Sequence, residues 1–233
     1  MAEASAPRAA RARARAEITA EILDAGRRQL AEVGAAQLSL RAVARELGMV
    51  SSAVYRYVSS RDELLTLLII ESYDALGEVA EAASEASRRR GPRNRWVDVA
   101  LAVRGWAITH PNEYALVYGS PVPGYEAPED TVVPGTRVSR CLVAVVAEAA
   151  ADRSLVPTLD LGLAAPIRSD LRALADVLEV DLPAPVLAAT LVAWTQLFGL
   201  LSFEVFGQTR GIVDDHEAFF RAAADAMAAG IGL

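Results

Sequence analysis

Lysine is absent from the sequence, and all 23 cationic side chains are arginine. Together with the abundance of alanine, this indicates GC-rich coding rather than a mechanism. Cysteine occurs once, which excludes an intramolecular disulfide framework and fits a reducing cytoplasm, where we expect the chain to reside. Because Cys141 stands in an apolar helical run, we expect it in the core, with redox sensing as the alternative.

Long apolar runs are also lacking. No uninterrupted run reaches the roughly 18 residues that a membrane span needs, and no apolar region of a signal peptide follows the arginines of residues 1–15. We therefore expect no membrane partner. Aromatic residues make up 6% of the chain, but 53% is hydrophobic, which excludes wholesale disorder. Abundant alanine and the lack of strand-like alternation predict an all-α fold.

The side chains of enzyme chemistry are scarce. The chain has two histidines, and it lacks a glycine phosphate loop, a nucleophile elbow and a metal-ligand cluster. His110 stands before a proline and is typical of a helix terminator. His216 follows Asp214 and Asp215, where a solvated helix cap is the plain interpretation. The sequence therefore predicts no catalytic residue, no metal and no cofactor, so we do not expect an enzyme.

The net charge of −7 is unevenly distributed. Residues 1–61 contain 10 arginines and 6 acidic residues, a balance of +4, whereas residues 62–233 contain 13 arginines and 24 acidic residues, a balance of −11. A basic end of this kind can meet phosphates while the acidic remainder repels DNA.

Two short amphipathic helices follow one another in residues 39–61. Ser39 is a suitable N-cap for the first, and Gly48 can end it in the left-handed conformation. Ser51 can cap the second. Two helices joined by such a turn form the motif whose second helix enters the major groove of DNA. The inner stripe of the second helix is Val50, Val54, Tyr57 and Val58.

The outer faces of this motif suit DNA. Ser52 and Ala53 are small enough for a close approach to base edges, and the tyrosine hydroxyls can reach phosphates. The alternative is an ordinary helical hairpin with a solvated polar face. The candidate contacts read from the residues are Arg41, Ser52, Ala53, Tyr55, Arg56, Tyr57 and Arg61.

Residues 22–65 resemble the amino-terminal domain of the TetR/AcrR transcriptional regulators. The resemblance rests on a first helix ending near Gly34, the segments SLRAVARELGMVSS and VYRYV, and RDELL at the start of a long helix. The family usually has Phe at Val58 and Lys at Arg61, and both changes keep an apolar plug and a cation near a phosphate. The resemblance implies DNA contacts at Ser39, Arg41, Ser51, Ser52, Ala53, Tyr55, Arg56, Tyr57 and Arg61.

The carboxy-terminal part resembles the Trp-His-Gly type of regulatory domain found in some TetR-type proteins. The matching residues are His110-Pro111 with Tyr114, and Trp194 with Gly199 and Gly207; Phe198 stands where that group often has His. We expect a basic arm (residues 1–16), a three-helix DNA-binding domain (17–62), and a helical domain for ligand binding and dimerisation (63–233), with nine to ten helices in all. The expected helices beyond the motif span residues 17–33, 60–87, 93–109, 112–118, 135–151, 167–178, 183–206 and 214–229.

The arm contains Arg8, Arg11, Arg13 and Arg15 among alanines. One interpretation is a disordered tail with a weak electrostatic role. The other is an arm that lies along phosphates or inserts arginine into the minor groove.

The two last helices are strongly apolar, and the resemblance implies a four-helix interface between two copies of the chain. A symmetric patch is a common way to cover such surface, and the alternative is a core within one protomer. A homodimer would read a palindromic operator with half-sites about 34–36 Å apart. The candidate interface residues are Leu197, Leu201, Val205, Phe219, Phe220 and Met227.

A small-molecule effector is also expected. Its pocket would be mostly apolar, which favours an apolar or aromatic molecule, although core packing is the alternative for each residue. Effector binding would shift the population of conformers and release the DNA, which makes repression the favoured role. The other function we consider is a helical ligand-binding or interaction dimer without an operator. The candidate pocket residues are Trp96, Val103, Trp106, His110, Tyr114, Tyr118, Cys141, Trp194 and Phe198.

Overall fold

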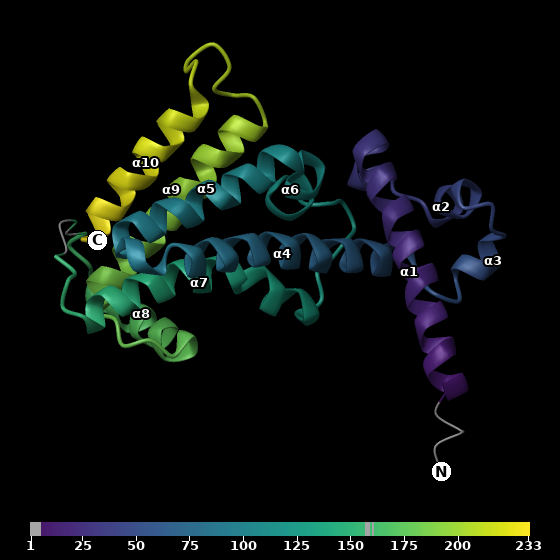
Figure 1. Cartoon of the computed structure of the whole chain (residues 1–233), viewed down its shortest axis with the longest axis horizontal. Coiled ribbons are helices and arrows are strands. Elements are labelled where there is room, and N and C mark those ends of the chain that lie inside the picture. The colour runs from purple at the N-terminus through teal and green to yellow at the C-terminus, as the bar shows by residue number, and fades with distance from the viewer. Residues whose placement is uncertain (1–5, 157–158, 160) are drawn as a thin grey trace. The chain divides into compact units, whose positions relative to one another are not determined.

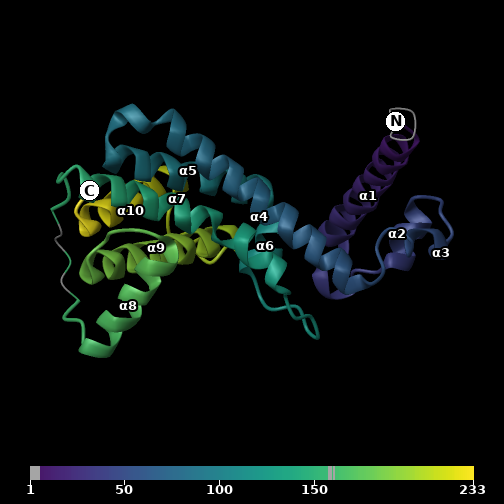
Figure 2. The ribbon, with the colours of Figure 1, turned by 90° about the horizontal axis from the view of Figure 1, so that it is seen from below.

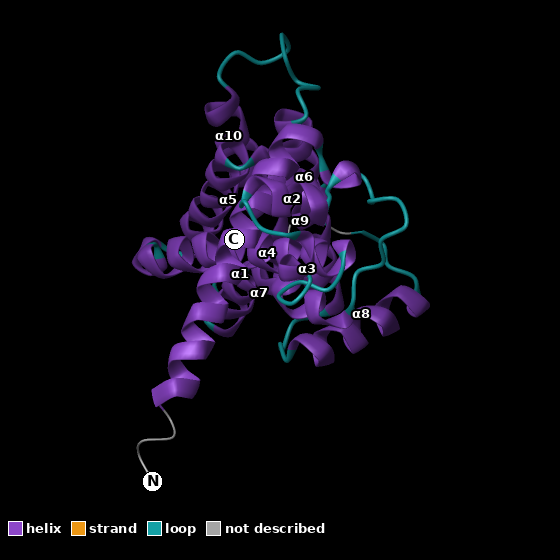
Figure 3. Cartoon of the chain, turned by 90° about the vertical axis from the view of Figure 1, so that its right-hand side faces the viewer, coloured by secondary structure: helices purple, strands orange, loops and turns teal. Residues whose placement is uncertain are grey.

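The structure, a computed structural model, describes residues 6–156, 159 and 161–233. These residues form helices joined by loops, and no strand occurs among them (Figure 3), which confirms the all-α prediction. The helices are α1 (Ala6–Val33), α2 (Leu40–Glu46), α3 (Ser51–Val54), α4 (Arg61–Ala86), α5 (Pro92–Thr109), α6 (Pro111–Tyr118), α7 (Val132–Ala151), α8 (Ala165–Leu178), α9 (Ala184–Val205) and α10 (His216–Ile231), with the short 3-10 helices η1 (Ala35–Gln37), η2 (Arg88–Arg90) and η3 (Glu129–Thr131).

The chain divides into two compact units, whose elements are labelled in Figure 1. Unit 1 comprises the described residues up to 73 together with 112–132, and unit 2 comprises residues 74–111 and 133–233. We expected the DNA-binding domain to end at residue 62 and the carboxy-terminal domain to begin at residue 63. The difference arises because the start of α4 supplies buried Leu64 and Leu68 to the core of unit 1, and because Tyr125 packs against the same core.

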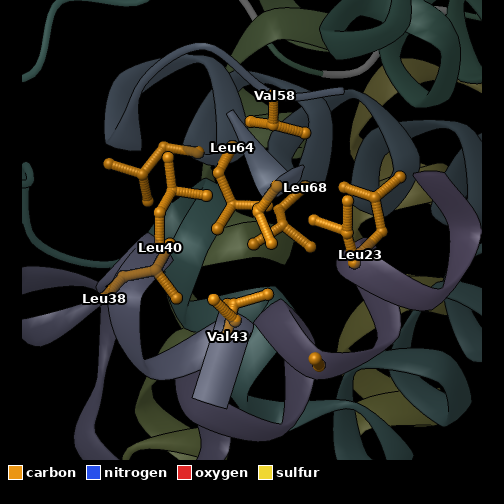
Figure 4. Packing of buried hydrophobic residues seen from close by; sticks show 12 residues of the cluster. Leu23, Leu38, Leu40, Val43, Val58, Leu64 and Leu68 are labelled. Carbon is orange, nitrogen blue, oxygen red and sulfur yellow. The ribbon is translucent and has the colours of Figure 1, made fainter. Parts of the chain in front are cut away.

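The core of unit 1 forms where α1, α2, α3 and the first turns of α4 meet (Figure 4). At Gly26 of α1, a Cβ atom would lie 3.3 Å from a methyl carbon of both Leu64 and Leu68, so glycine lets α1 and α4 approach closely. The cluster of buried side chains is Ile22, Leu23, Ala25, Leu38, Leu40, Val43, Ala44, Val54, Val58, Leu64, Leu65 and Leu68.

The turn between α2 and α3 is built on glycine, as the sequence predicts. Gly48 has φ +65°, in the left-handed region that glycine adopts without a Cβ penalty. The Gly48 N–H donates to the Arg45 carbonyl at 3.2 Å, and the Met49 N–H donates to the Ala44 carbonyl at 2.8 Å. This pair of bonds ends α2 and satisfies its last carbonyls. The cap of α3 differs from the prediction by one residue, since Val50 rather than Ser51 holds the N-cap position.

Helix α4 begins with side-chain caps. The Ser60 hydroxyl accepts from the Glu63 N–H at 3.0 Å, as the predicted capping-box spacing requires. The Glu63 carboxylate reaches one residue further back than expected, to the hydroxyl and the N–H of Ser59 at 2.5 and 2.6 Å. These hydrogen bonds from Ser59 hold the pKa of the Glu63 carboxyl below its usual range. The start of α4 is therefore fixed in place.

In unit 2, helices α5, α9 and α10 lie side by side (Figures 1 and 2). Leu197 and Leu201 of α9 and Phe220 of α10 are completely buried within the protomer. This contradicts their predicted place in a dimer interface, because side chains without exposed surface cannot contact a partner. Their apolar stripe faces the neighbouring helices instead.

Helix α9 is, among the described residues, the one helix long and apolar enough to cross a membrane by length and composition. Its apolar sequence is interrupted by Thr190, Thr195 and Gln196. Helix α9 therefore contains no uninterrupted apolar run of the length that a membrane span needs, as expected from the sequence. Half of its most apolar window is buried inside the protein, as in the core helix of a bundle.

Helix α1 begins at Ala6, about eleven residues before the predicted start at residue 17. Alanine and arginine both have high helix propensity, so an arm made of them can extend a helix that already has a packed end. The described part of the expected basic arm thus belongs to α1, and its residues 8 and 10–16 are exposed.

Candidate nucleic-acid interface

Helix α3, which ends at Val54, and the turn of residues 55–58 after it together have one buried and one exposed face. Val54 and Val58 have no exposed surface, whereas Tyr55 is 45% exposed and Ser52 and Arg56 are exposed. Because the valines fix the helix against the core shown in Figure 4, the polar and basic side chains beside them face solvent. A surface of this composition can meet base edges and phosphates.

The remaining candidates on and after α3 are less exposed. Ser51 and Ala53 are half-buried, and Tyr57 is half-buried and packs against the core of unit 1. The guanidinium of Arg15 in α1 lies over the Tyr57 ring, with its carbon 5.4 Å from the ring centroid. This cation–π contact joins the basic part of α1 to the α3 surface. Local sequence patterns could not predict this contact, because 42 residues separate Arg15 and Tyr57 along the chain.

The two candidate DNA contacts at the start of α2, Ser39 and Arg41, differ in their exposure and in their hydrogen bonds. Arg41 is exposed and available to a ligand. Ser39 holds the N-cap position of α2 with extended backbone angles, but its side chain makes no capping hydrogen bond there. Its N–H instead donates to Oε1 of Gln29 in α1 at 3.2 Å. Gln29 therefore fixes the entry to α2 from the side of α1.

Arg61 has partners inside unit 1. Its Nη2 donates to the carbonyl oxygens of Ala35 at 2.9 Å and Ala36 at 3.2 Å, and its Nε donates to that of Leu38 at 3.2 Å. Arg61, which we expected near a phosphate, is thus hydrogen-bonded to the linker between α1 and α2.

The four arginines of the expected arm lie in the first half of α1, and all four are exposed. Arg8, Arg11 and Arg15 stand at offsets 0, +3 and +7, so they share one face of the helix, and Arg13 lies on another. Arg15 is the residue that contacts Tyr57. The three arginines therefore continue the basic character of the α3 surface along α1.

The candidate effector contacts occur in both units, and the structure brings six of the nine together in pairs. In unit 2, Trp106 stacks on His110 with ring centroids 4.9 Å apart, and Trp194 lies 5.8 Å from Phe198. In unit 1, Tyr114 stacks on Tyr118 at 5.2 Å. Trp96, Val103, Trp106, Tyr114, Cys141 and Phe198 are buried, Tyr118 and Trp194 are half-buried, and His110 is exposed.

Cys141 lines a pocket of about 300 Å³ with Glu81, Ser84, Arg95 and Arg137 among its neighbours. This charged lining differs from the apolar lining expected for the effector. Burial raises the pKa of the Cys141 thiol, which disfavours the reactive thiolate.

His110 ends α5, as the sequence analysis expected. Its N–H donates to the Trp106 carbonyl at 2.8 Å, and its Nδ1 lies 3.0 Å from the same oxygen. His216 begins α10, where the Asp215 carboxylate accepts from the Ala218 N–H at 2.9 Å. Both histidines therefore stand at helix ends in ordinary capping surroundings.

Exposed apolar side chains on α9 and α10 mark a second surface. Phe219 is 46% exposed, and Val205 and Met227 are half-buried, so these three expected interface residues keep surface for a partner. The structure adds Phe203 and Phe206, which the sequence analysis did not select. Periodicity cannot separate inner from outer residues on a helix that is apolar on every face.

A groove of about 390 Å³ lies between α9 and α10. Small residues dominate its lining, which lets another backbone approach closely. Its lining residues are Leu159, Ala189, Val192, Ala193, Gln196, Ala223, Ala226, Met227 and Gly230.

Comparisons with known proteins agree with this arrangement. Residues 22–68 match the family model described as bacterial regulatory proteins, tetR family, and residues 96–227 match the model described as tetracyclin repressor-like, C-terminal domain. The HTH-type transcriptional regulators Rv1816 of Mycobacterium tuberculosis (strain ATCC 25618 / H37Rv) and Mb1846 of Mycobacterium bovis (strain ATCC BAA-935 / AF2122/97) are each 44% identical to this chain over 196 residues, which cover 84% of this chain and 83% of the relative.

Solved structures share the fold. The regulatory protein SCO4313 is 32% identical, with a TM-score of 0.74 over 92% of this chain and 97% of that chain. The TetR family transcriptional regulator PfmR from Thermus thermophilus is 17% identical, with a TM-score of 0.59 over 90% and 97%, and shows the fold alone. The matched models cover both the helix-turn-helix and most of the remaining helices. This chain belongs to the TetR family of transcriptional regulators, which bind DNA and are not enzymes.

Proposed function

We propose that this regulator is a homodimeric repressor that reads a palindromic operator through α3 and is released by a small apolar or aromatic effector. The observation that carries the proposal is that α3 and the turn of residues 55–58 after it divide into two faces. Buried Val54 and Val58 anchor the helix, while exposed Ser52, Tyr55 and Arg56 face away from the core. The major groove admits a helical segment, and the exposed side chains of this one can meet base edges and phosphates.

Each candidate contact has a proposed role. Ser51, Ser52 and Ala53 let the start of α3 approach base edges, and Arg56 and Arg41 supply charge for phosphates or guanine. The tyrosine hydroxyls of Tyr55 and Tyr57 donate to phosphate oxygens, with Arg15 held beside Tyr57. Ser39 stands at the entry to α2.

The dimer is proposed to form through α9 and α10. Exposed Phe203, Phe206 and Phe219 supply apolar contact area, and the small-residue groove between the helices can receive side chains of a second copy. This pairing would also cover the exposed apolar side of α9. We further propose that the protein works in the cytoplasm, where the DNA is, without a membrane partner.

The effector is proposed to bind the carboxy-terminal domain. We assign this domain to the Trp-His-Gly type because it contains the matching residues Trp194, His110-Pro111, Gly199 and Gly207. The indole Nε1–H groups of Trp96 and Trp194 are buried, and neither finds an acceptor among the described residues. Such unsatisfied donors favour a ligand that carries an acceptor. We therefore propose an aromatic or apolar effector with a carbonyl or similar oxygen.

The proposal is tested by binding to the DNA beside the protein's own gene, compared with a scrambled duplex of equal length and composition. We expect preference for the first duplex, lost on Arg56→Ala and weakened by Tyr55→Phe. Arg172→Ala is the matched control, because Arg172 is an exposed arginine of α8 in unit 2 and should not affect DNA binding. Equal affinity of the wild-type protein for both duplexes would favour the alternative function, a helical ligand-binding or interaction dimer without an operator.

A further inference from the structure

We infer that Arg61 is a positioning residue of the DNA-binding unit, which holds the linker before α2 in place and does not contact a phosphate. The inference rests on the proposed reading of DNA by α3. It explains how α3 is held in position relative to the start of α4.

The linker between α1 and α2 has little regular structure of its own. It consists of η1 with a few flanking residues, and its own backbone hydrogen bonds are those from the N–H groups of Gln37 and Leu38 to the carbonyls of Gly34 and Ala35, at 3.2 and 3.4 Å. The guanidinium of Arg61 donates to the carbonyl oxygens of Ala35, Ala36 and Leu38, over distances of 2.9 to 3.2 Å, and so adds a second donor at Ala35. Its remaining nitrogen, Nη1, lies 3.4 Å from a carboxylate oxygen of Asp62. All three nitrogens therefore face acceptors of the same chain.

Both sides of this contact are anchored. Arg61 is the first residue of α4, whose start is fixed by the Ser60 cap at 3.0 Å. On the linker, Leu38 is buried in the core of unit 1, and the next N–H, of Ser39, donates to Gln29 at 3.2 Å. The linker is thus held from α4 by Arg61 and from α1 by Gln29.

The residue type suits this contact. A planar guanidinium with five donors in a fixed fork can serve three carbonyl oxygens at once, whereas a lysine ammonium is a compact point charge. A cation in the first turn of a helix is also disfavoured by the helix dipole. The carbonyl oxygens of the linker offset this, because they place negative partial charge around Arg61.

The positions of α2 and α3 depend on this linker. Helix α2 starts at Leu40, directly after the linker, and α3 packs against α2. A linker that moves would therefore displace α2 and α3 together from their position against α4. Loss of the Arg61 contact should lower sequence discrimination while leaving the number of phosphate contacts unchanged.

The experiment compares Arg61→Lys and Arg61→Gln with Arg56→Gln, which changes an exposed arginine beside α3. The probes are the duplex beside the gene and its scrambled counterpart, across a series of salt concentrations. For both Arg61 variants we expect the affinity ratio between the duplexes to fall at least about tenfold, with an unchanged salt slope on the scrambled duplex. For Arg56→Gln, the slope should fall by about 0.9.

Two results would overturn the inference. If Arg61→Lys keeps the full affinity ratio and Arg61→Gln loses about 0.9 in salt slope, Arg61 is a phosphate contact. If both variants lower the unfolding temperature but keep the ratio, its role is in stability alone.

A measurement on the wild-type protein covers variants that do not fold. The Arg61 Nε–H resonance should exchange slowly with water in the free protein and keep its position when the scrambled duplex is added. Fast exchange, or a shift on adding DNA, would contradict the inference. Failure of the wild-type protein to distinguish the two duplexes would count against the proposed function, and the Nε–H exchange would still decide the role of Arg61.

Discussion

Arg104 of α5 and Glu204 of α9 form a bidentate ion pair in unit 2, with 2.9 Å between Nε and Oε2 and 2.6 Å between Nη2 and Oε1. The two side chains are only 13% and 10% exposed. Glu217 of α10 lies 3.6 Å from Nη1, and the same guanidinium lies over the Phe220 ring. One arginine thus links three helices of the expected dimerisation region.

Replacing Glu204 by Ala should destabilise the protein strongly. The change leaves Arg104 largely buried without its main partner, which costs about 3 kcal/mol at the lower end of the range for broken buried pairs. Urea unfolding at neutral pH measures the loss. The matched control is Asp225→Asn, which removes the exposed pair with Arg93 and should change the unfolding midpoint very little. Equal losses for the two variants would contradict this account of the buried pair.

Gly48→Ala tests the turn between α2 and α3. No atom lies within 4 Å of an added Cβ, so the cost comes from the left-handed backbone alone, about 1–2 kcal/mol. Gly105 of α5 is an exposed helical glycine with equally open surroundings, and Gly105→Ala should stabilise the protein by about 0.5–1 kcal/mol. Chemical unfolding of both variants should therefore show shifts of opposite sign. Shifts of the same sign would show that backbone conformation does not govern Gly48.

The side chain of Arg137 in α7 lies across α4 at Gly77, where a Cβ would come within 2.6 Å of its Nε. It donates to Glu81 at 2.7 and 2.9 Å and to Asp74 at 2.7 Å, and the bonds to Glu81 hold the pKa of the Glu81 carboxyl below its usual range. A carboxyl whose pKa is lowered by folding stabilises the protein above its unfolded pKa, and this contribution is lost as the pH falls through the folded value.

Arg137→Gln should therefore flatten the acid side of the stability profile. The unfolding temperature of the variant should fall less than that of the wild type between about pH 5 and pH 3. In an NMR titration, the pKa of the Glu81 carboxyl should rise toward its ordinary value. An unchanged pKa would mean that Arg137 is not its main partner in solution.

Removing residues 1–12 tests the basic face of α1. The truncation deletes Arg8 and Arg11 but keeps Arg15 and its contact with Tyr57. If both deleted arginines lie at phosphates, the salt slope of DNA binding should decrease by about 1.8. Substituting Arg13→Ala, on another face, is the control and should leave the slope unchanged. A full-length slope in the truncated protein would support a solvated helix without a DNA role.

The sequence predicted most of the fold because the decisive signals are local. The glycine after α2 and the serine caps of α4 depend on neighbouring residues, and both lie where the pattern places them. The contacts of Arg61 with Ala35 and Leu38 could not be predicted, since they join residues more than 20 positions apart. The exposed apolar side of α9, which includes Phe203, was not predicted either, because apolar residues on all faces carry no direction.

The start of α1 was predicted too late for a related reason. Packed residues such as Ile22 give a helical pattern, but an exposed stretch of alanine and arginine has none, although its propensity favours a helix. The assignment of residues 112–132 to unit 1 depends on tertiary contacts alone, among them the 2.9 Å hydrogen bond between the hydroxyls of Thr66 and Tyr125.

The central claim, that two copies of α3 read a palindrome, is tested most directly by hydroxyl-radical footprinting on the DNA beside the gene. The account predicts two protected patches of inverted sequence, about 34–36 Å apart from centre to centre, that disappear with Arg56→Ala and persist with Arg172→Ala. A single patch, or uniform protection indistinguishable from that on the scrambled duplex, would contradict it.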